Sequence, residues 1–205
     1  MRALFCSALI LSLLLRHLPQ IWIDLRNLRR PSVTHHPTLA RGWFIQLCYI
    51  SILIYCFNAL FVERRQLTFL KWLGLGLVWF GGIIGILSLV SLRESYSFEI
   101  RITKNFKLIT TGIYRVIRHP MRLGLTLEAI GLVAISGMPY LLFLVGVIVI
   151  LQVIRTTQEE AFLKFHLGEP YYQYLQRVPA YNLFKGVCLF IFSGLAKSRT
   201  SDNRS

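Results

Sequence analysis

Acidic residues are scarce in this chain, and its cysteines are few and scattered. The 205 residues include 9 Asp and Glu against 23 Lys and Arg, and none of the 4 Cys forms a ligand-spaced pair. This pattern argues against a cysteine metal centre and against a disulfide framework. Internal repeats and low-complexity tracts are also missing. We therefore expect one membrane domain over residues 1–196, followed by a disordered tail at 197–205.

Long apolar runs are what the chain has in abundance. Hydrophobic residues make up 55% of the sequence. Residues 43–62 and 72–92 carry no charge and reach the length of about 20 residues that a membrane-crossing helix needs. These two runs predict an integral membrane protein of the all-α class, built as a helical bundle.

The first apolar run, residues 3–15, follows Arg2 and so imitates a secretory signal. No small-residue cleavage site comes after it, because Arg16, His17 and Pro19 occupy that region. We therefore predict an uncleaved first helix that can run on through residues 21–23.

Two shorter apolar runs, residues 123–135 and 140–154, flank a turn sequence that contains Gly137 and Pro139. A helix of about 15 residues rises roughly 22 Å, less than the ~30 Å hydrocarbon core. These helices either barely span the membrane or are extended by their polar ends. The chain then has about five transmembrane helices, of which the fourth and fifth form a hairpin.

Most of the basic residues lie in three segments of the chain. Residues 16–41 hold five Lys or Arg, residues 93–122 hold seven, and residues from 155 onward hold seven. If these three segments are cytoplasmic, the positive-inside rule is satisfied by five spans with the N-terminus outside. Anionic lipid headgroups are then the expected partner of the net charge of +14, and nothing specific favours nucleic acid.

The remaining segments are less regular. Residues 93–111 predict a surface loop with short strand-like or helical pieces. Residues 156–167 predict an amphipathic helix that stops at Gly168 and restarts near Pro170, where Tyr171, Tyr172 and Tyr174 supply interfacial aromatics. Residues 181–195 are apolar enough to lie on the membrane or dip into it. The glycine-rich third run, with Gly81 and Gly85, favours close packing inside the molecule over a dimer interface.

A dense polar cluster begins the fourth helix. It consists of Tyr114, Arg115, Arg118, His119 and Arg122. The hairpin returns a second cluster, Arg155, Glu159 and Glu160, to the same membrane face. Such groups are costly near a membrane, and a helix start beside Pro120 has free N–H groups that can hold an anionic ligand. The simpler alternatives are topology-setting arginines, an Arg155–Glu159 surface pair and a histidine that caps the helix.

Glu128 is an acid inside the fourth helix. One interpretation makes it a partner for a group on a neighbouring helix. The other makes it functional, because ionisable residues at that depth commonly are. The sequence leaves both open.

Several motifs in order resemble the isoprenylcysteine carboxyl methyltransferase and phospholipid methyltransferase superfamily. The resemblance covers residues 93–180. It rests on residues 108–114, on Arg118-His119-Pro120-Met121 with Gly124, on Arg155 with Glu159 and Glu160, on Gly168-Glu169 with Tyr171 and Tyr174, and on Arg177-Val178-Pro179.

The resemblance implies a membrane-embedded site for S-adenosyl-L-methionine, and the absence of a glycine-rich dinucleotide fingerprint agrees with it. It places Arg155 at the methyl acceptor and Glu159 in catalysis. The implied cofactor contacts are Phe106, Lys107, Leu108, Ile109, Tyr114, His119, Pro120, Met121, Arg122, Glu159 and Glu160. At one position the chain departs from the pattern, since Arg122 stands where a tyrosine is usual.

The implied activity is methyl transfer to a lipophilic acceptor, of the isoprenylcysteine carboxyl O-methyltransferase type. The alternatives are N-methylation of ethanolamine phospholipids, a non-catalytic membrane protein that retains the fold, and a related NADPH-dependent reductase. The expected partners are a prenylated or lipid substrate and membrane lipids. The expected location is a bacterial inner membrane or an endomembrane, with a multi-pass chain whose site faces the cytoplasm.

Overall fold

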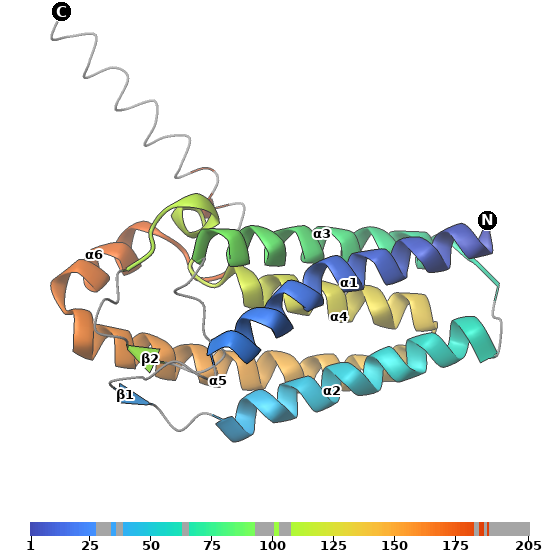
Figure 1. Ribbon diagram of the computed structural model, residues 1–205, viewed down its shortest axis with the longest axis horizontal. Coiled ribbons are helices and arrows are strands. Elements are labelled where there is room, and N and C mark those ends of the chain that lie inside the picture. Colours follow the sequence, from blue (N-terminus) through green and yellow to red (C-terminus); the bar gives the residue numbers. More distant parts are fainter. Residues whose placement is uncertain are drawn as a thin grey trace, which may run out of the picture.

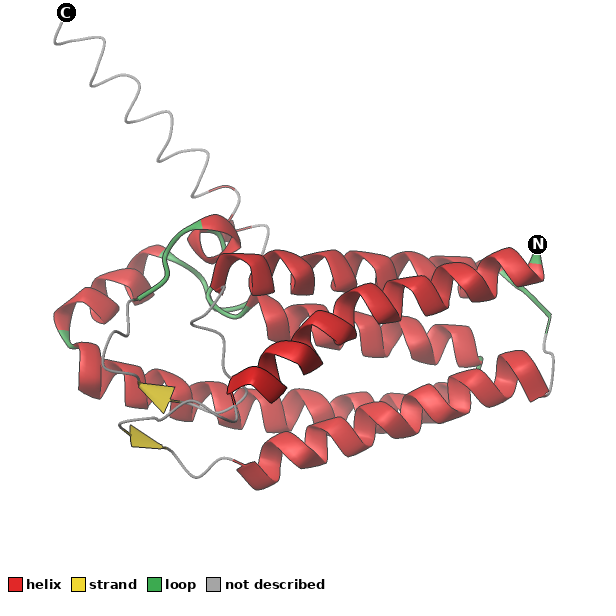
Figure 2. Ribbon diagram, in the orientation of Figure 1, coloured by secondary structure: helices red, strands yellow, loops and turns green. Residues whose placement is uncertain are grey.

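Long helices form nearly all of the described structure, a computed structural model (Figures 1 and 2). It describes residues 1–27, 34–35, 39–62, 66–92, 101–102, 108–182, 185–186 and 188. In these ranges the main helices are α1 (Arg2–Asn27), α2 (Leu39–Phe57), α3 (Phe69–Leu92), α4 (Pro120–Ser136), α5 (Leu142–Leu167) and α6 (Glu169–Arg177). A π-helical segment, Asn58–Val62, extends α2.

The helices lie in two layers along a common direction. Helices α1, α3 and α4 form one layer, and α2 and α5 form the other (Figure 1). Each of these five helices contributes fully buried apolar side chains to one core. Examples, one from each helix, are Leu9, Ile52, Val78, Leu132 and Ile148. Two short strands, β1 (Thr34–His35) and β2 (Arg101–Ile102), pair antiparallel.

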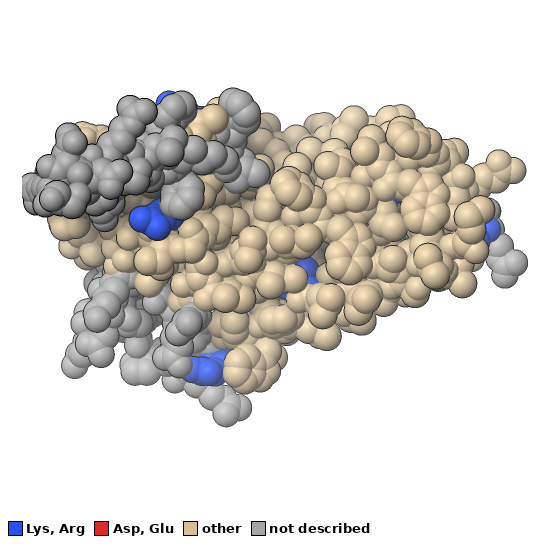
Figure 3. Space-filling model, turned by 90° about the horizontal axis from the view of Figure 1, so that it is seen from above, with Lys and Arg blue, Asp and Glu red and all other residues tan. Residues whose placement is uncertain are grey.

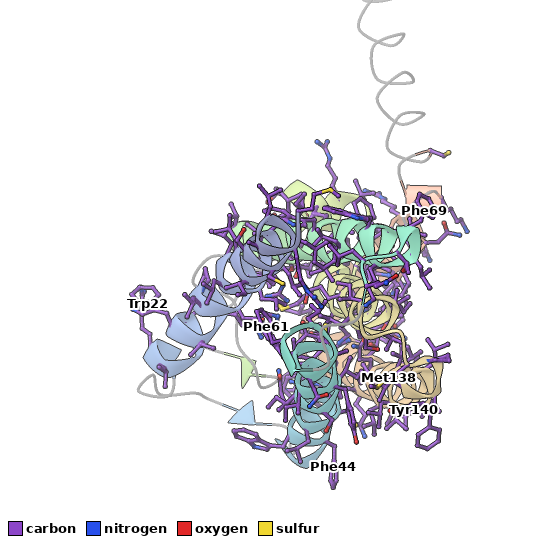
Figure 4. All side chains as sticks on the ribbon, turned by 90° about the vertical axis from the view of Figure 1, so that its right-hand side faces the viewer. Trp22, Phe44, Phe61, Phe69, Met138 and Tyr140 are labelled. Atoms are coloured by element: carbon purple, nitrogen blue, oxygen red, sulfur yellow. The ribbon has the colours of Figure 1, made fainter. Side chains whose placement is uncertain are left out.

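The outside of the bundle is apolar. The side chains of Trp22, Phe44, Phe69 and Tyr140 extend away from it (Figure 4), and each is more than half exposed. On the face seen in Figure 3, Lys and Arg show only as small isolated patches on an otherwise uncharged described surface. A soluble protein rarely exposes apolar surface so continuously, whereas lipid covers it without cost.

Four described helices are long and apolar enough to cross a membrane: Arg2–Ile23, Trp43–Phe61, Phe69–Leu92 and Pro139–Leu167. Helix α4, with 17 residues, is shorter. The predicted all-α membrane bundle is confirmed.

The predicted extension of the first helix through residues 21–23 is confirmed, since α1 continues through Pro19 to Asn27. One helix end differs from the prediction. Helix α5 joins the predicted apolar run to the predicted amphipathic helix without a break, because no Gly or Pro lies between Gly146 and Gly168. The predicted turns are confirmed, since Gly137 and Gly168 end their helices with φ of 68° and 60°.

Helices α3 and α4 cross closely through two pairs of glycines. A methyl group at Gly81 would lie 2.5 Å from the Gly124 carbonyl oxygen, and one at Gly74 would lie 2.7 Å from the Gly131 carbonyl oxygen. Only glycine permits this approach of two backbones. The prediction of close packing inside the molecule is confirmed for Gly81.

We expect Gly81→Ala to destabilise the bundle by about 1–3 kcal/mol, because the added methyl group forces the two backbones apart. Gly76→Ala is the matched control on the same helix, where a methyl group would meet no atom within 4 Å. Unfolding in mixed detergent micelles measures both. Equal stabilities of the two variants would contradict the prediction.

The acid inside α4 has partners on two other helices. Glu128 is 1% exposed, and its carboxylate lies 3.6 Å from Arg16 Nε and 3.4 Å from His17 Nε2, both on α1. The Tyr49 hydroxyl on α2 donates to it at 3.2 Å. Gly85 leaves room for this arrangement, because a methyl group there would lie 1.9 Å from Arg16 Nε. The first interpretation of Glu128, a partner for neighbouring helices, is therefore the one that the fold supports.

Candidate active site

The start of α4 is held by the segment that follows α6. The backbone N–H of Arg118 donates to the Pro179 carbonyl at 3.0 Å, and that of His119 donates to the Ala180 carbonyl at 3.2 Å. The sequence suggested that N–H groups at this helix start are free to hold an anion. These two are not, because the C-terminal segment already accepts from them.

Arg122 is the centre of the cluster. One terminal nitrogen of its guanidinium, Nη2, pairs with the Glu159 carboxylate. The other, Nη1, donates to the Thr156 hydroxyl and to His119 Nδ1, the latter at 3.2 Å. Arg122 belongs to the first turn of α4, whereas Glu159 and Thr156 lie on α5. The arginine that stands in place of the usual tyrosine therefore joins the two helices of the hairpin.

Thr156 connects the cluster to the chain beyond α6. Its hydroxyl donates to the Gln152 carbonyl at 2.8 Å and accepts from Arg122. Tyr181 also bonds this hydroxyl. Since the threonine has a single proton, Tyr181 must be the donor.

His119 fits the site as a neutral ring. Its Nε2 lies 3.0 Å from Glu160 Oε1, and its Nδ1 accepts from Arg122. A ring with a proton on Nε2 alone satisfies both partners. Glu160 also accepts from Arg118 at 2.6 Å. Burial lowers the pKa of His119 below its ordinary range, against the opposing effect of its bond to Glu160.

We expect stability to fall as the pH drops below about 6.5, the pKa of histidine in an unfolded chain. Between that value and the lower folded pKa of His119, the unfolded chain binds a proton that the folded chain does not. The contribution of His119 to the unfolding free energy therefore falls toward acid by up to ~1.4 kcal/mol per pH unit and is constant above this interval. Unfolding at several pH values checks this against His119→Gln, which should lack that part of the slope. Identical slopes would contradict it.

Tyr114 lies just before the start of α4 and is held by two hydrogen bonds. It lies in the short 3-10 helix Gly112–Arg115, and its hydroxyl is 2.7 Å from the Ser88 hydroxyl on α3. Its carbonyl accepts from the Tyr174 hydroxyl at 2.8 Å. Burial raises the pKa values of both tyrosines, so both stay protonated.

The aromatic residues of α6 are not all at the surface. Tyr171 and Tyr174 are buried and Tyr172 is exposed, so the prediction of three interfacial tyrosines was wrong for two of them. The helix turns these two rings inward, against Leu108 and Val178.

The structure brings together most of the residues predicted for the site. His119, Arg122, Glu159 and Glu160 share direct contacts, and Arg155 lies one turn before Glu159 on α5. Pro120 is buried, whereas Met121, Leu108 and Ile109 are half-buried. Phe106 and Lys107 lie outside the described residues.

Sequence reasoning missed four polar residues around this cluster: Ser88, Gln152, Thr156 and Tyr181. For α5 a signal was available. Gln152, Thr156 and Glu159 are spaced by four and three residues, which places them on one helix face.

Known proteins resemble this chain over the same region. The sequence profile of the phospholipid methyltransferase family matches residues 69–169. A probable protein-S-isoprenylcysteine O-methyltransferase of Oryza sativa subsp. indica is 33% identical over 155 residues, 73% of this chain and 80% of the relative. The chain belongs to the isoprenylcysteine carboxyl methyltransferase and phospholipid methyltransferase superfamily.

Two further members of this superfamily are similar. Protein-S-isoprenylcysteine O-methyltransferase B of Arabidopsis thaliana is 28% identical over 135 residues, 64% of this chain and 68% of its own length. The Homo sapiens protein-S-isoprenylcysteine O-methyltransferase is 30% identical over 129 residues, 60% of this chain and 44% of its own length. This chain is accordingly a membrane methyltransferase. The region that the family profile matches includes all of α3, α4 and α5.

Proposed function

We propose that this methyltransferase uses S-adenosyl-L-methionine to methylate the carboxylate of a lipophilic acceptor of the isoprenylcysteine type. Two of the relatives described above are named as protein-S-isoprenylcysteine O-methyltransferases, and a third as a probable one. The observation that carries the proposal is the position of Arg155 on α5. It lies one turn before Glu159 and Glu160, which pair with Arg122 and His119 at the start of α4. One domain over residues 1–196 would do this, with the cofactor held by residues 93–180.

The residues at the start of α4 fit this cofactor. Its amino acid end carries one carboxylate and one ammonium group. Arg122 and Glu159 offer the opposite charges side by side, with side chains 16% and 29% exposed, so they are sheltered but reachable. Bound S-adenosylmethionine supplies an electrophilic methyl group on a sulfonium sulfur.

In this arrangement Arg122 holds the carboxylate of the cofactor and Glu159 holds its ammonium group or a ribose hydroxyl. His119 keeps Arg122 in place, and Glu160 keeps His119 in place. Tyr114, Pro120 and Met121, together with Leu108 and Ile109, form the walls.

A carboxylate acceptor suits the site better than an amine. Arg155 can pair with an acceptor carboxylate, which attacks the methyl group without first losing a proton. An amine must lose one to a base. The nearby candidates are Glu159, which is paired with Arg122, and Glu160 and His119, which are paired with each other. Each of these three groups already has a partner, which competes with its action as a base.

The second candidate is N-methylation of ethanolamine phospholipids. The family profile that matches residues 69–169 is that of phospholipid methyltransferases, which is the observation in its favour. It requires one of the paired groups above to release its partner during turnover.

Two measurements test the proposal. Calorimetry on detergent-solubilised protein should detect binding of S-adenosylhomocysteine, and its absence would refute the use of this cofactor. Incubation with cofactor labelled in the methyl group should label a prenylcysteine carboxylate and leave phosphatidylethanolamine unlabelled. Label in the lipid amine alone would favour the second candidate.

We extend the proposal to topology. The basic residues at 16–41, 93–122 and after 155 support a site at the cytoplasmic face of a multi-pass protein, by the positive-inside rule. Anionic lipid headgroups then meet this face.

A further inference from the structure

One face of α5 continues the polar cluster toward the middle of the bundle. Gln152, Arg155, Thr156 and Glu159 follow one another on this face at helical spacing. Gln152 is the innermost of them and is 4% exposed. It lies between α5 and α4, because its amide meets Thr126, one turn along α4 from Arg122.

The Gln152 amide is only half satisfied. The Thr126 hydroxyl lies 3.3 Å from Gln152 Oε1 and 3.0 Å from the Arg122 carbonyl, whereas Nε2 has no hydrogen-bond partner in the described part of the chain. Thr126 has one proton and cannot donate well to both. If the amide is turned over, Nε2 donates to Thr126 and Oε1 becomes the atom without a partner. In either orientation one polar atom of the amide is left over.

A buried amide atom without a partner lowers stability, and an apolar side chain of similar size would avoid this cost. The position is one turn from Arg155, on the side away from Glu159. A molecule whose carboxylate pairs with Arg155 and whose hydrocarbon chain runs along this face of α5 toward the middle of the bundle would meet Gln152.

We propose that Gln152 hydrogen-bonds the polar end of the methyl acceptor and fixes how deeply the acceptor enters between α4 and α5. This inference rests on the proposed function. A prenylcysteine presents a carboxylate oxygen and, next to it, an N–H group. The free atom of the amide matches one of these in each orientation, as a donor to the oxygen or as an acceptor from the N–H.

Gln152→Leu tests the inference. It removes the hydrogen bond to the acceptor but keeps the volume, so the KM for the acceptor should rise about tenfold. Affinity for S-adenosylhomocysteine should stay within twofold, because Gln152 contacts none of the groups proposed for the cofactor. The midpoint of thermal unfolding without acceptor should stay level or rise. Gln46→Leu, the same change at a half-buried position of α2, is the control and should leave the KM unchanged.

The outcomes separate this inference from the proposed function. The wild-type protein is screened first with a prenylcysteine and with phosphatidylethanolamine, and the KM is then measured with whichever it methylates. Wild-type activity on the lipid amine alone refutes the proposed function, whereas a raised KM for that amine would still support contact by Gln152. An unchanged KM overturns the inference. If the unfolding midpoint falls as well, the role of the amide is structural. The unfolding midpoint needs no acceptor, so a marked fall in it counts against the inference even if neither molecule is methylated.

Discussion

Replacing Glu159 with alanine is expected to abolish methyl transfer and to weaken the binding of S-adenosylhomocysteine by about 100-fold or more. The carboxylate pairs with Arg122, which also bonds His119 and Thr156. Without it, the guanidinium keeps its charge in a sheltered site and loses its only acidic partner among the described residues. The cofactor would lose a direct contact and a properly placed Arg122 at the same time.

Calorimetry and single-turnover transfer of a labelled methyl group measure the two effects. Glu169→Ala, an exposed acid at the start of α6, is the matched control and should bind as the wild type does. Glu159→Gln keeps the shape of the side chain and should retain part of the affinity. Wild-type binding by Glu159→Ala, in protein whose circular dichroism is unchanged, would show that the cofactor binds elsewhere.

A double-mutant cycle tests whether Arg122 and Glu159 act as a unit. Each single alanine variant should lose most of the binding, and the double variant should lose little more, because either change already disrupts the pair. Additive losses would mean that the two residues contact the cofactor independently.

Much of the bundle could be predicted from apolar length alone. Residues 43–62 and 72–92 admit hardly any structure other than a membrane helix, because every backbone polar group must be satisfied within the segment. Turn residues were equally informative, since Gly137 and Gly168 end helices where expected. The end of α1 was less predictable, because Pro19 is tolerated inside this helix.

The pairing within the site could not be predicted from the sequence. Arg122 and Glu159 are 37 residues apart, and their contact depends on the rotation of α4 and α5 about their axes. Tyr174 illustrates the same limit. The sequence suggested that its ring lies at the membrane interface, but in the fold its hydroxyl donates to the Tyr114 carbonyl in the 3-10 helix.

Glu128→Ala is expected to destabilise the bundle by about 3–5 kcal/mol, the largest effect on stability among the changes considered. The substitution leaves Arg16, 1% exposed, as a buried cation without its carboxylate. It also removes the acceptor of the Tyr49 hydroxyl. Since these partners lie on α1 and α2, the change loosens three helices at once. Unfolding in mixed detergent micelles measures the loss, with Glu169→Ala as the control.

The pair can be removed without this penalty if both charges go together. Arg16→Met with Glu128→Met keeps the volume and leaves no buried charge, so most of the stability lost in Glu128→Ala should return. Methyl transfer by the double variant then decides what the pair is for. Wild-type rates would make it purely structural. A low rate in a stable double variant would instead mean that the functional interpretation of Glu128 holds as well, because packing alone would then not account for the acid.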